Sequence, residues 1–212
     1  MEAFAQFRQW KIGAQTDAPG KSMAEALSDD REMLRQLKKG NEQAFSALYE
    51  RYQGPIYRFV LHMSGNGSIA EEITQEVFMA LITNTKGYDE AKGPLGGYLY
   101  GIARNLTRRS LEQGRYFVPM AEDMAEAENN EPASNLDILA DLSKSELVEC
   151  LRKAVLALPE QYREIVVLCD LEEMSYDNVA ALLNCSPGTV ASRLHRARAT
   201  LKMRLKGQGC LR

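Results

Sequence analysis

The sequence predicts an all-α protein with two small helical domains joined by an acidic linker. Apolar residues recur at spacings of three and four along most of the chain, which is typical of helices that bury one face. No run alternates polar and apolar residues as a β-strand would. Charge also varies along the chain: two mildly basic blocks flank residues 116–146, which hold 8 acidic and 1 basic side chain.

The same observations divide the chain into four parts. Weak periodicity before residue 29 predicts a flexible extension, and the Pro-containing acidic stretch has the composition of a linker. The predicted parts are the extension 1–28, an N-terminal domain 29–115, a linker 116–145 and a C-terminal domain 146–207.

Composition excludes several classes of protein. The four cysteines form no C-x-x-C pair and the two histidines lie in no ligand-like cluster, so we expect neither a metal nor another cofactor. No apolar run approaches the roughly 20 residues that span a bilayer, and no signal peptide is recognisable. We therefore expect a cytoplasmic protein without membrane insertion. A phosphate loop, a nucleophile elbow and a paired-carboxylate pattern are also absent from the sequence, which argues against an enzyme.

Capping residues predict where the N-terminal helices begin. Asp29 or Asp30 is expected to cap the first helix and Asn41 to start the second, which Pro55 bends. Ser68 is expected to cap the third helix, after the turn at residues 65–67. A glycine-rich loop over residues 84–97 precedes a fourth helix, which carries four polar side chains together on one face: Arg104, Asn105, Arg108 and Arg109.

The C-terminal domain carries a helix-turn-helix pattern. Helical periodicity resumes near Ser143, and Ser175 is expected to cap a short helix that ends at Asn184, where the turn requires positive φ. Ser186 and Pro187 have the chemistry of an N-cap and a first helical residue. The helix that follows has the core-facing stripe Val190, Leu194, Ala197 and Leu201.

This last helix is basic, and no acidic residue occurs after Asp177. A helix of this size fits the major groove of B-DNA, where its first residues meet base edges and its arginines hold phosphates. The alternative is a solvated basic face on a helix that packs only against its own domain. The short capped helix and tight turn before it favour DNA binding.

Four segments resemble the extracytoplasmic-function (ECF) sigma factors, in that family's order. Residues 188–198, GTVASRLHRAR, are similar to the G-T-V-x-S-R-L-x-R-A-R signature of region 4, and residues 158–164 to its L-P-x-x-x-R-E element. Residues 70–78, AEEITQEVF, resemble region 2.2, and residues 98–105, YLYGIARN, resemble the W-L-x-x-I-A-R-N run of region 2.4. The sequence departs from the family pattern at Ile69, Tyr98 and Ala191, where Asp, Trp and a basic residue are common.

The resemblance implies three functional surfaces. Glu72, Gln75 and Glu76 would dock on the coiled coil of the largest subunit of core RNA polymerase. The −10 promoter element would be read and melted by Tyr88, Tyr98, Arg104, Asn105, Arg108 and Arg109. The −35 element would be read in duplex form by Thr189, Ala191, Ser192, Arg193, His195, Arg196 and Arg198, with Arg193 and Arg198 on backbone or intramolecular pairs.

The resemblance also implies partners and a function. An alternative sigma factor binds core RNA polymerase and promoter DNA, directs promoter recognition and melting, and is usually restrained by an anti-sigma factor. The acidic linker would thread polymerase channels, or act only as a self-repelling spacer. For Tyr88 and Tyr98, a role as ordinary core aromatics remains open. The alternative function is a stand-alone helix-turn-helix transcriptional regulator, whose N-terminal helices sense a ligand or dimerise.

Overall fold

The computed structural model describes residues 23–84, 87–89, 93–116 and 138–207. Within these ranges the chain is helical and contains no strand, as predicted. The elements of the N-terminal bundle are α2 (Met23–Lys38), α3 (Glu42–Ser64), α4 (Gly67–Thr83) and α5 (Leu95–Tyr116). Those of the C-terminal domain are α6 (Ile138–Leu156), α7 (Glu160–Val166), the π-helical turn η3 (Val167–Leu171), α8 (Tyr176–Leu183) and α9 (Pro187–Gly207).

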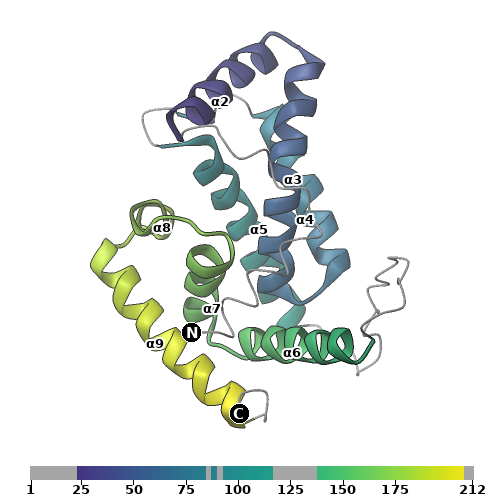
Figure 1. Ribbon diagram of the computed structural model, residues 1–212. Helices are drawn as coiled ribbons and strands as arrows, with labels where there is room; N and C mark the ends of the chain where they lie inside the picture. Colours follow the sequence, from purple (N-terminus) through teal and green to yellow (C-terminus); the bar gives the residue numbers. More distant parts are fainter. Residues whose placement is uncertain (1–22, 85–86, 90–92, 117–137, 208–212) are drawn as a thin grey trace.

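In the N-terminal bundle, α3 packs against α2, α4 and α5 (Figure 1). Asn41 caps α3, as predicted, by accepting hydrogen bonds from the amides of Gln43 and Ala44. The bundle core is built from the apolar stripes of all four helices. Its fully buried members include Leu34, Leu48, Phe59, Val60, Val77, Leu81 and Leu99.

Two predicted helix starts in the N-terminal bundle are wrong. Helix α2 begins at Met23, so Asp29 and Asp30 lie inside it rather than at its N-cap. Asp30 instead accepts hydrogen bonds from Tyr52 Oη and from Arg51, each at 2.5 Å, and so joins α2 to α3. Helix α4 is capped by Asn66, not Ser68: the Asn66 side chain accepts a hydrogen bond from the amide of Ile69 at 3.1 Å.

The C-terminal domain contains the predicted helix-turn-helix. Ser175 caps α8 by accepting a hydrogen bond from the amide of Asn178 at 3.2 Å, and Asn184 ends it with φ 52°, as the sequence predicted. Helix α6 begins at Ile138, earlier than the predicted start near Ser143 and inside the predicted linker. Residues 1–22 of the predicted extension and 117–137 of the linker lie outside the described residues.

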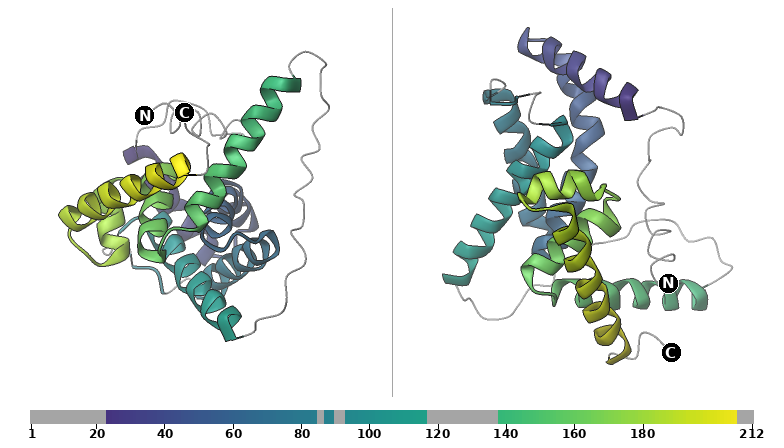
Figure 2. Two further views of the ribbon diagram at one scale, coloured as in Figure 1. Left: turned by 90° about the horizontal axis from the view of Figure 1, so that it is seen from below. Right: turned by 90° about the vertical axis from the view of Figure 1, so that its left-hand side faces the viewer.

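The two domains pack directly against one another. Helix α6 crosses one end of α3, and α8 lies beside α5 (Figure 1); α6 also projects beyond the rest of the molecule (Figure 2). Gly65, which ends α3 with φ 72°, lies against Leu156, the last residue of α6. A Cβ at this position would lie 2.9 Å from Leu156 Cδ1, so both the turn and the approach of α6 require glycine.

No helix in the described ranges has the length and apolar character needed to cross a membrane. Within the same ranges, His, Cys, Asp and Glu side chains form no group of three that would hold a metal ion.

Candidate nucleic-acid and polymerase interfaces

Local sequence chemistry sets the start and the orientation of α9. Ser186 Oγ accepts a hydrogen bond from the amide of Thr189 at 3.1 Å, and Pro187 is the first helical residue, as predicted. The predicted stripe is buried: Val190, Leu194, Ala197 and Leu201 are each at most 1% exposed. This packing fixes which face of α9 looks outward, because the residues on the side of the helix opposite the stripe must point to solvent.

The outward face of α9 carries most of the residues predicted to read the −35 element. Ala191, Ser192, His195 and Arg196 are exposed, whereas Thr189 and Arg193 are half-buried. Arg198 is also exposed, but its guanidinium binds the Asp170 carboxylate through two hydrogen bonds, the longer at 3.0 Å. This pair raises the pKa of Arg198 and ties α9 to η3, and a contact of Arg198 with the backbone of the −35 element stays a prediction.

Helix α5 carries the residues predicted to read the −10 element. Leu99 and Ala103 are fully buried, and Asn105, Arg108 and Arg109 are exposed on other faces. Arg104 is half-buried and donates hydrogen bonds to Glu164 of α7. Arg108 Nε lies 3.3 Å from Glu160 Oε1, also on α7. Two of the three predicted phosphate-binding arginines of α5 therefore contact carboxylates of the C-terminal domain.

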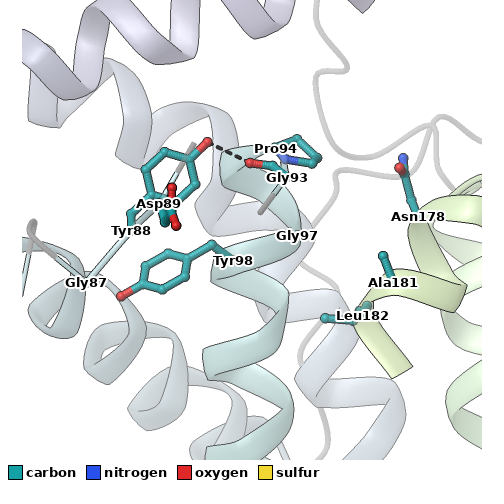
Figure 3. Close-up of a pocket in the computed structure, with 10 residues that line it drawn as sticks. All are labelled: Gly87, Tyr88, Asp89, Gly93, Pro94, Gly97, Tyr98, Asn178, Ala181 and Leu182. Atoms are coloured by element: carbon teal, nitrogen blue, oxygen red, sulfur yellow. Dashed lines mark hydrogen bonds between the residues drawn. The ribbon is translucent and has the colours of Figure 1, made fainter. Parts of the chain in front are cut away.

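Tyr88 and Tyr98 line a pocket of about 420 Å³ between the two domains (Figure 3). Their ring centroids lie 5.5 Å apart and the planes are tilted by 58°. The Tyr88 hydroxyl donates a hydrogen bond to the Gly93 carbonyl at 2.9 Å, which holds the ring against its own loop. Across the pocket, α8 contributes Asn178, Ala181 and Leu182.

The outward face of α4 contains the predicted docking residues and extends beyond them. Glu72, Gln75 and Glu76 are all exposed, while Ile73 and Val77 on the opposite face are buried. Two large apolar side chains continue this face toward the end of the helix: Met79 is 58% exposed and Ile82 is 44% exposed. Both follow the docking residues at helical spacing, so an acidic surface runs into an apolar one.

Sequence reasoning missed Met79, Ile82 and the acidic residues Glu160, Glu164 and Glu172. The spacing of Met79 from Glu72 and Glu76 was a usable signal, because 72, 76 and 79 fall on one helical face. Glu164 belongs to the element at residues 158–164, but no signal in the sequence gives its partner, since Arg104 and Glu164 are 60 residues apart and meet only through the packing of the domains.

His62 is a buried titratable group beside these surfaces. It lies in the last turn of α3 and is 5% exposed. Burial, together with the cationic side chains of Arg58 on α3 and Arg152 on α6, lowers the pKa of His62 to about 4.

Family profiles match both domains. The Sigma-70 region 2 profile matches residues 48–116, from within α3 to the end of α5. The profile of Sigma-70, region 4, matches residues 148–201, from α6 into α9. The two matches fall in the two structural domains and in the order that the sequence predicted.

Relatives and solved structures extend the match to most of the chain. The chain is 31% identical to the ECF RNA polymerase sigma factor SigW of Bacillus subtilis over 180 residues, 82% of this chain and 95% of that protein. It is 33% identical to the ECF RNA polymerase sigma-E factor of Escherichia coli K12 over 186 residues, 84% of this chain and 95% of that protein. The fold resembles CnrH in complex with the cytosolic domain of CnrY, with a TM-score of 0.62 at 22% identity over 84% of this chain and 98% of the other. The chain therefore belongs to the ECF sigma factors, a family of DNA-binding proteins that act in transcription initiation.

Proposed function

We propose that this sigma factor binds core RNA polymerase through α4, reads the −10 element with α5 and reads the −35 element with α9. The observation that carries the proposal is the outward face of α9. Its apolar stripe is fully packed, it starts at a capped turn after α8, and it presents Ser192, His195 and Arg196 to solvent without a single acidic neighbour on the helix. Such a helix suits the major groove.

The proposed −10 surface lies on α5 and on the loop that precedes it. Asn105 is exposed and offers an amide that hydrogen-bonds base edges. Arg104, Arg108 and Arg109 supply positive charge for phosphates, and Tyr88 and Tyr98 supply rings on which an unstacked base would lie. In this role the pocket beside the two tyrosines would receive a base of the melted strand.

The docking surface combines charge with apolar contact. Glu72 and Glu76 would set the orientation and the association rate through their charge, whereas Met79 would add contact area that excludes water. We propose the coiled coil of the largest polymerase subunit as the target. The function requires no catalytic group, metal or cofactor of the chain's own, and we propose that the chain is not an enzyme and acts inside the cell.

Run-off transcription with purified core polymerase on a library of random promoters tests the proposal. We expect specific transcripts only when both the chain and core polymerase are present. The alternative, a stand-alone regulator, predicts that the chain alone protects specific duplex DNA. Tight, specific footprints without polymerase together with no transcription would overturn the sigma assignment of these surfaces.

Two variants test the docking face separately from folding. Glu72→Lys and Met79→Asp change exposed side chains of α4, so helical content is expected to be unchanged while co-purification with core polymerase falls about tenfold. Glu50→Lys is the matched control, because Glu50 is an exposed glutamate of the same bundle on α3. Equal binding by all three variants would contradict this docking face.

The −35 assignment is tested by promoter selection. Ala191→Arg places a cation at a position of α9 that is exposed near its N-terminal end. We expect the selected −35 sequences to change while the −10 sequences stay the same, because base contacts at one position specify one part of the site. Unchanged −35 preferences would contradict the placement of α9 in the groove.

An anti-sigma factor is the remaining proposed partner. The sigma factor RpoE from Bartonella quintana, which has a similar fold, was solved in complex with the anti-sigma factor NepR. We propose a partner of this class for the present chain, to be sought by affinity purification of the tagged protein from its native cells.

A further inference from the structure

The first turn of α5 packs against a tyrosine of α3. A Cβ placed on Gly96 would lie 3.2 Å from Tyr52 Cε1 and 3.6 Å from the Tyr52 hydroxyl oxygen. Gly96 lies inside the helix, so its backbone conformation would accept alanine, and the Tyr52 ring is what an added methyl group would meet. Glycine at this position therefore lets the ring approach the backbone of α5 closely.

Tyr52 is held in this place by a buried carboxylate of α2. Its hydroxyl donates a hydrogen bond to Asp30 at 2.5 Å, and Asp30 is 4% exposed. Arg51 also donates to Asp30, at 2.5 Å, and balances the buried charge. Burial and then the hydrogen bond to Asp30 raise the pKa of Tyr52 well above its ordinary value, so the hydroxyl stays protonated and remains a donor. The ring that backs Gly96 is thus fixed at its hydroxyl end.

Both tyrosines of the proposed base pocket depend on the same turn of α5. Tyr98 follows Gly96 by two residues, so the two lie on nearly opposite sides of the helix. The Tyr98 amide donates to the Pro94 carbonyl at 3.3 Å, within this turn. The Tyr88 hydroxyl donates to the carbonyl of Gly93, which immediately precedes Pro94. A shift of the turn would therefore move both rings.

Tyr52 and Asp30 reach the pocket only through α5. Neither is among the residues that line the pocket, whereas Tyr88, Tyr98 and Gly97 are. A site keeps the geometry its ligand requires when the residues behind the contacting side chains lock them in place. Tyr52 is such a residue, because it supports the first turn of α5 from the side away from Tyr98.

We propose that Tyr52, anchored by Asp30, is a positioning residue for the −10 pocket: it sets the place of the first turn of α5, and with it the separation and tilt of the two rings that receive a base of the melted strand. The inference rests on the proposed function of α5. Asp30 is buried, so α2 contributes to promoter opening through this hydrogen bond and not by contacting DNA.

The first test removes the hydroxyl of Tyr52 and keeps the ring. Holoenzyme is assembled from core polymerase and the full chain, on a promoter recovered by the run-off selection and carrying 2-aminopurine in the non-template strand of the −10 element. Tyr52→Phe is expected to slow the fluorescence change of opening about fivefold and to leave protection of the −35 element at the wild-type level. Tyr49→Phe is the matched control: it lies one turn earlier on α3, where its ring packs on Phe78 of α4.

The second test is a double-mutant cycle across the contact between Tyr52 and Gly96. Gly96→Ala is expected to slow opening about fivefold, because its methyl group meets a ring that Asp30 holds in place. In the Tyr52→Phe background the ring is released and gives way, so the same substitution should slow opening further by less than about twofold. Gly114→Ala is the control on the same helix, since a Cβ there would meet no described atom within 4 Å.

A third measurement needs no polymerase. In the full chain labelled with ¹³C-tyrosine, the ring resonances of Tyr88 and Tyr98 should shift in Tyr52→Phe and Gly96→Ala and stay in place in the two controls. Circular dichroism and urea unfolding accompany each variant. A role in stability alone would slow opening in proportion to the unfolded fraction and would leave these resonances of the folded chain unchanged.

Several results would overturn the inference. They are a wild-type opening rate or wild-type ring resonances in Tyr52→Phe, an equal slowing by Tyr49→Phe, and effects of the two substitutions that multiply in the double variant. If the wild-type chain supports transcription in these cases, the proposed function stands and only the positioning role fails. Failure of the wild-type chain to transcribe with core polymerase would instead overturn the proposed function, and the inference with it.

Discussion

Replacing His62 with glutamine tests how the interface between α3 and α6 depends on pH. The imidazole is 5% exposed, and burial together with Arg58 and Arg152 lowers its pKa from 6.5 to about 4. The folded chain therefore holds His62 neutral, whereas the unfolded chain takes up a proton below pH 6.5. The contribution of His62 to stability is complete above pH 6.5, falls as the pH drops toward 4, and levels off below that.

The magnitude follows from the pKa difference. One pKa unit corresponds to about 1.4 kcal/mol, so between pH 7.5 and pH 4.5 His62 should lower the free energy of unfolding by about 2.5 kcal/mol. Urea unfolding of the wild type and of His62→Gln across this range measures it. The difference between the two curves cancels the titration of the carboxylates, which both proteins share.

His195→Gln is the matched control, because the chain has one other histidine and it is exposed on α9. It should keep the pH dependence of the wild type. Parallel stability curves for the wild type and His62→Gln, within about 0.5 kcal/mol over this range, would refute the burial argument. An imidazole resonance of His62 that titrates above pH 6 in the folded protein would do the same.

Other substitutions and conditions give separate expectations. Arg163 donates hydrogen bonds to the carbonyls of Met63, Leu156 and Leu158. Arg163→Ala should therefore lower the free energy of unfolding, measured in urea, by about 3 kcal/mol or more. The control Arg152→Ala removes only an ion pair with Glu149 within α6 and should lower it by roughly 0.5 kcal/mol. Leu194→Ala should cost about 3 kcal/mol in the same assay, because it empties a fully buried position of α9. Asn184→Ala should cost about 1 kcal/mol by thermal unfolding, since alanine tolerates φ 52° poorly, and Asn184→Gly should be nearly neutral. With about four phosphate contacts by α9, the logarithm of duplex affinity in the polymerase complex should fall with the logarithm of salt at a slope near −3.6, and a slope near zero would contradict those contacts.

The parts of the fold that depend on neighbouring residues were predictable from sequence. Ser175, Asn184 and Ser186 act where the sequence placed them, because a cap or a left-handed turn is decided by a few consecutive residues. The buried stripe of α9 followed from helical spacing alone. Such features do not require knowledge of the rest of the chain.

The two wrong helix starts in the N-terminal bundle have different causes. At α2 the cause is a contact with residues distant in sequence, and at α4 it is a second suitable cap residue nearby. Asp30 is a good N-cap residue by type, yet its carboxylate accepts hydrogen bonds from Tyr52 and Arg51, which lie more than 20 residues further along. At α4, Asn66 and Ser68 are both suitable caps, and the sequence offered no reason to prefer one. Contacts across the bundle decide the first case, and in the second the Asn66 side chain accepts the hydrogen bond from the Ile69 amide.

The candidate site shows the same division between local and distant information. Spacing placed Arg104, Asn105 and Arg108 near one another on α5, and the structure keeps Asn105 and Arg108 exposed while Arg104 turns toward Glu164. A periodic pattern states which way a side chain points but not which anion it meets, because that anion comes from a distant part of the chain. Arginine suits a carboxylate and a phosphate equally well, since both accept its paired N–H donors. The guanidinium groups of Arg104 and Arg108, which contact carboxylates in this structure, therefore have the chemistry that the proposed phosphate contacts require.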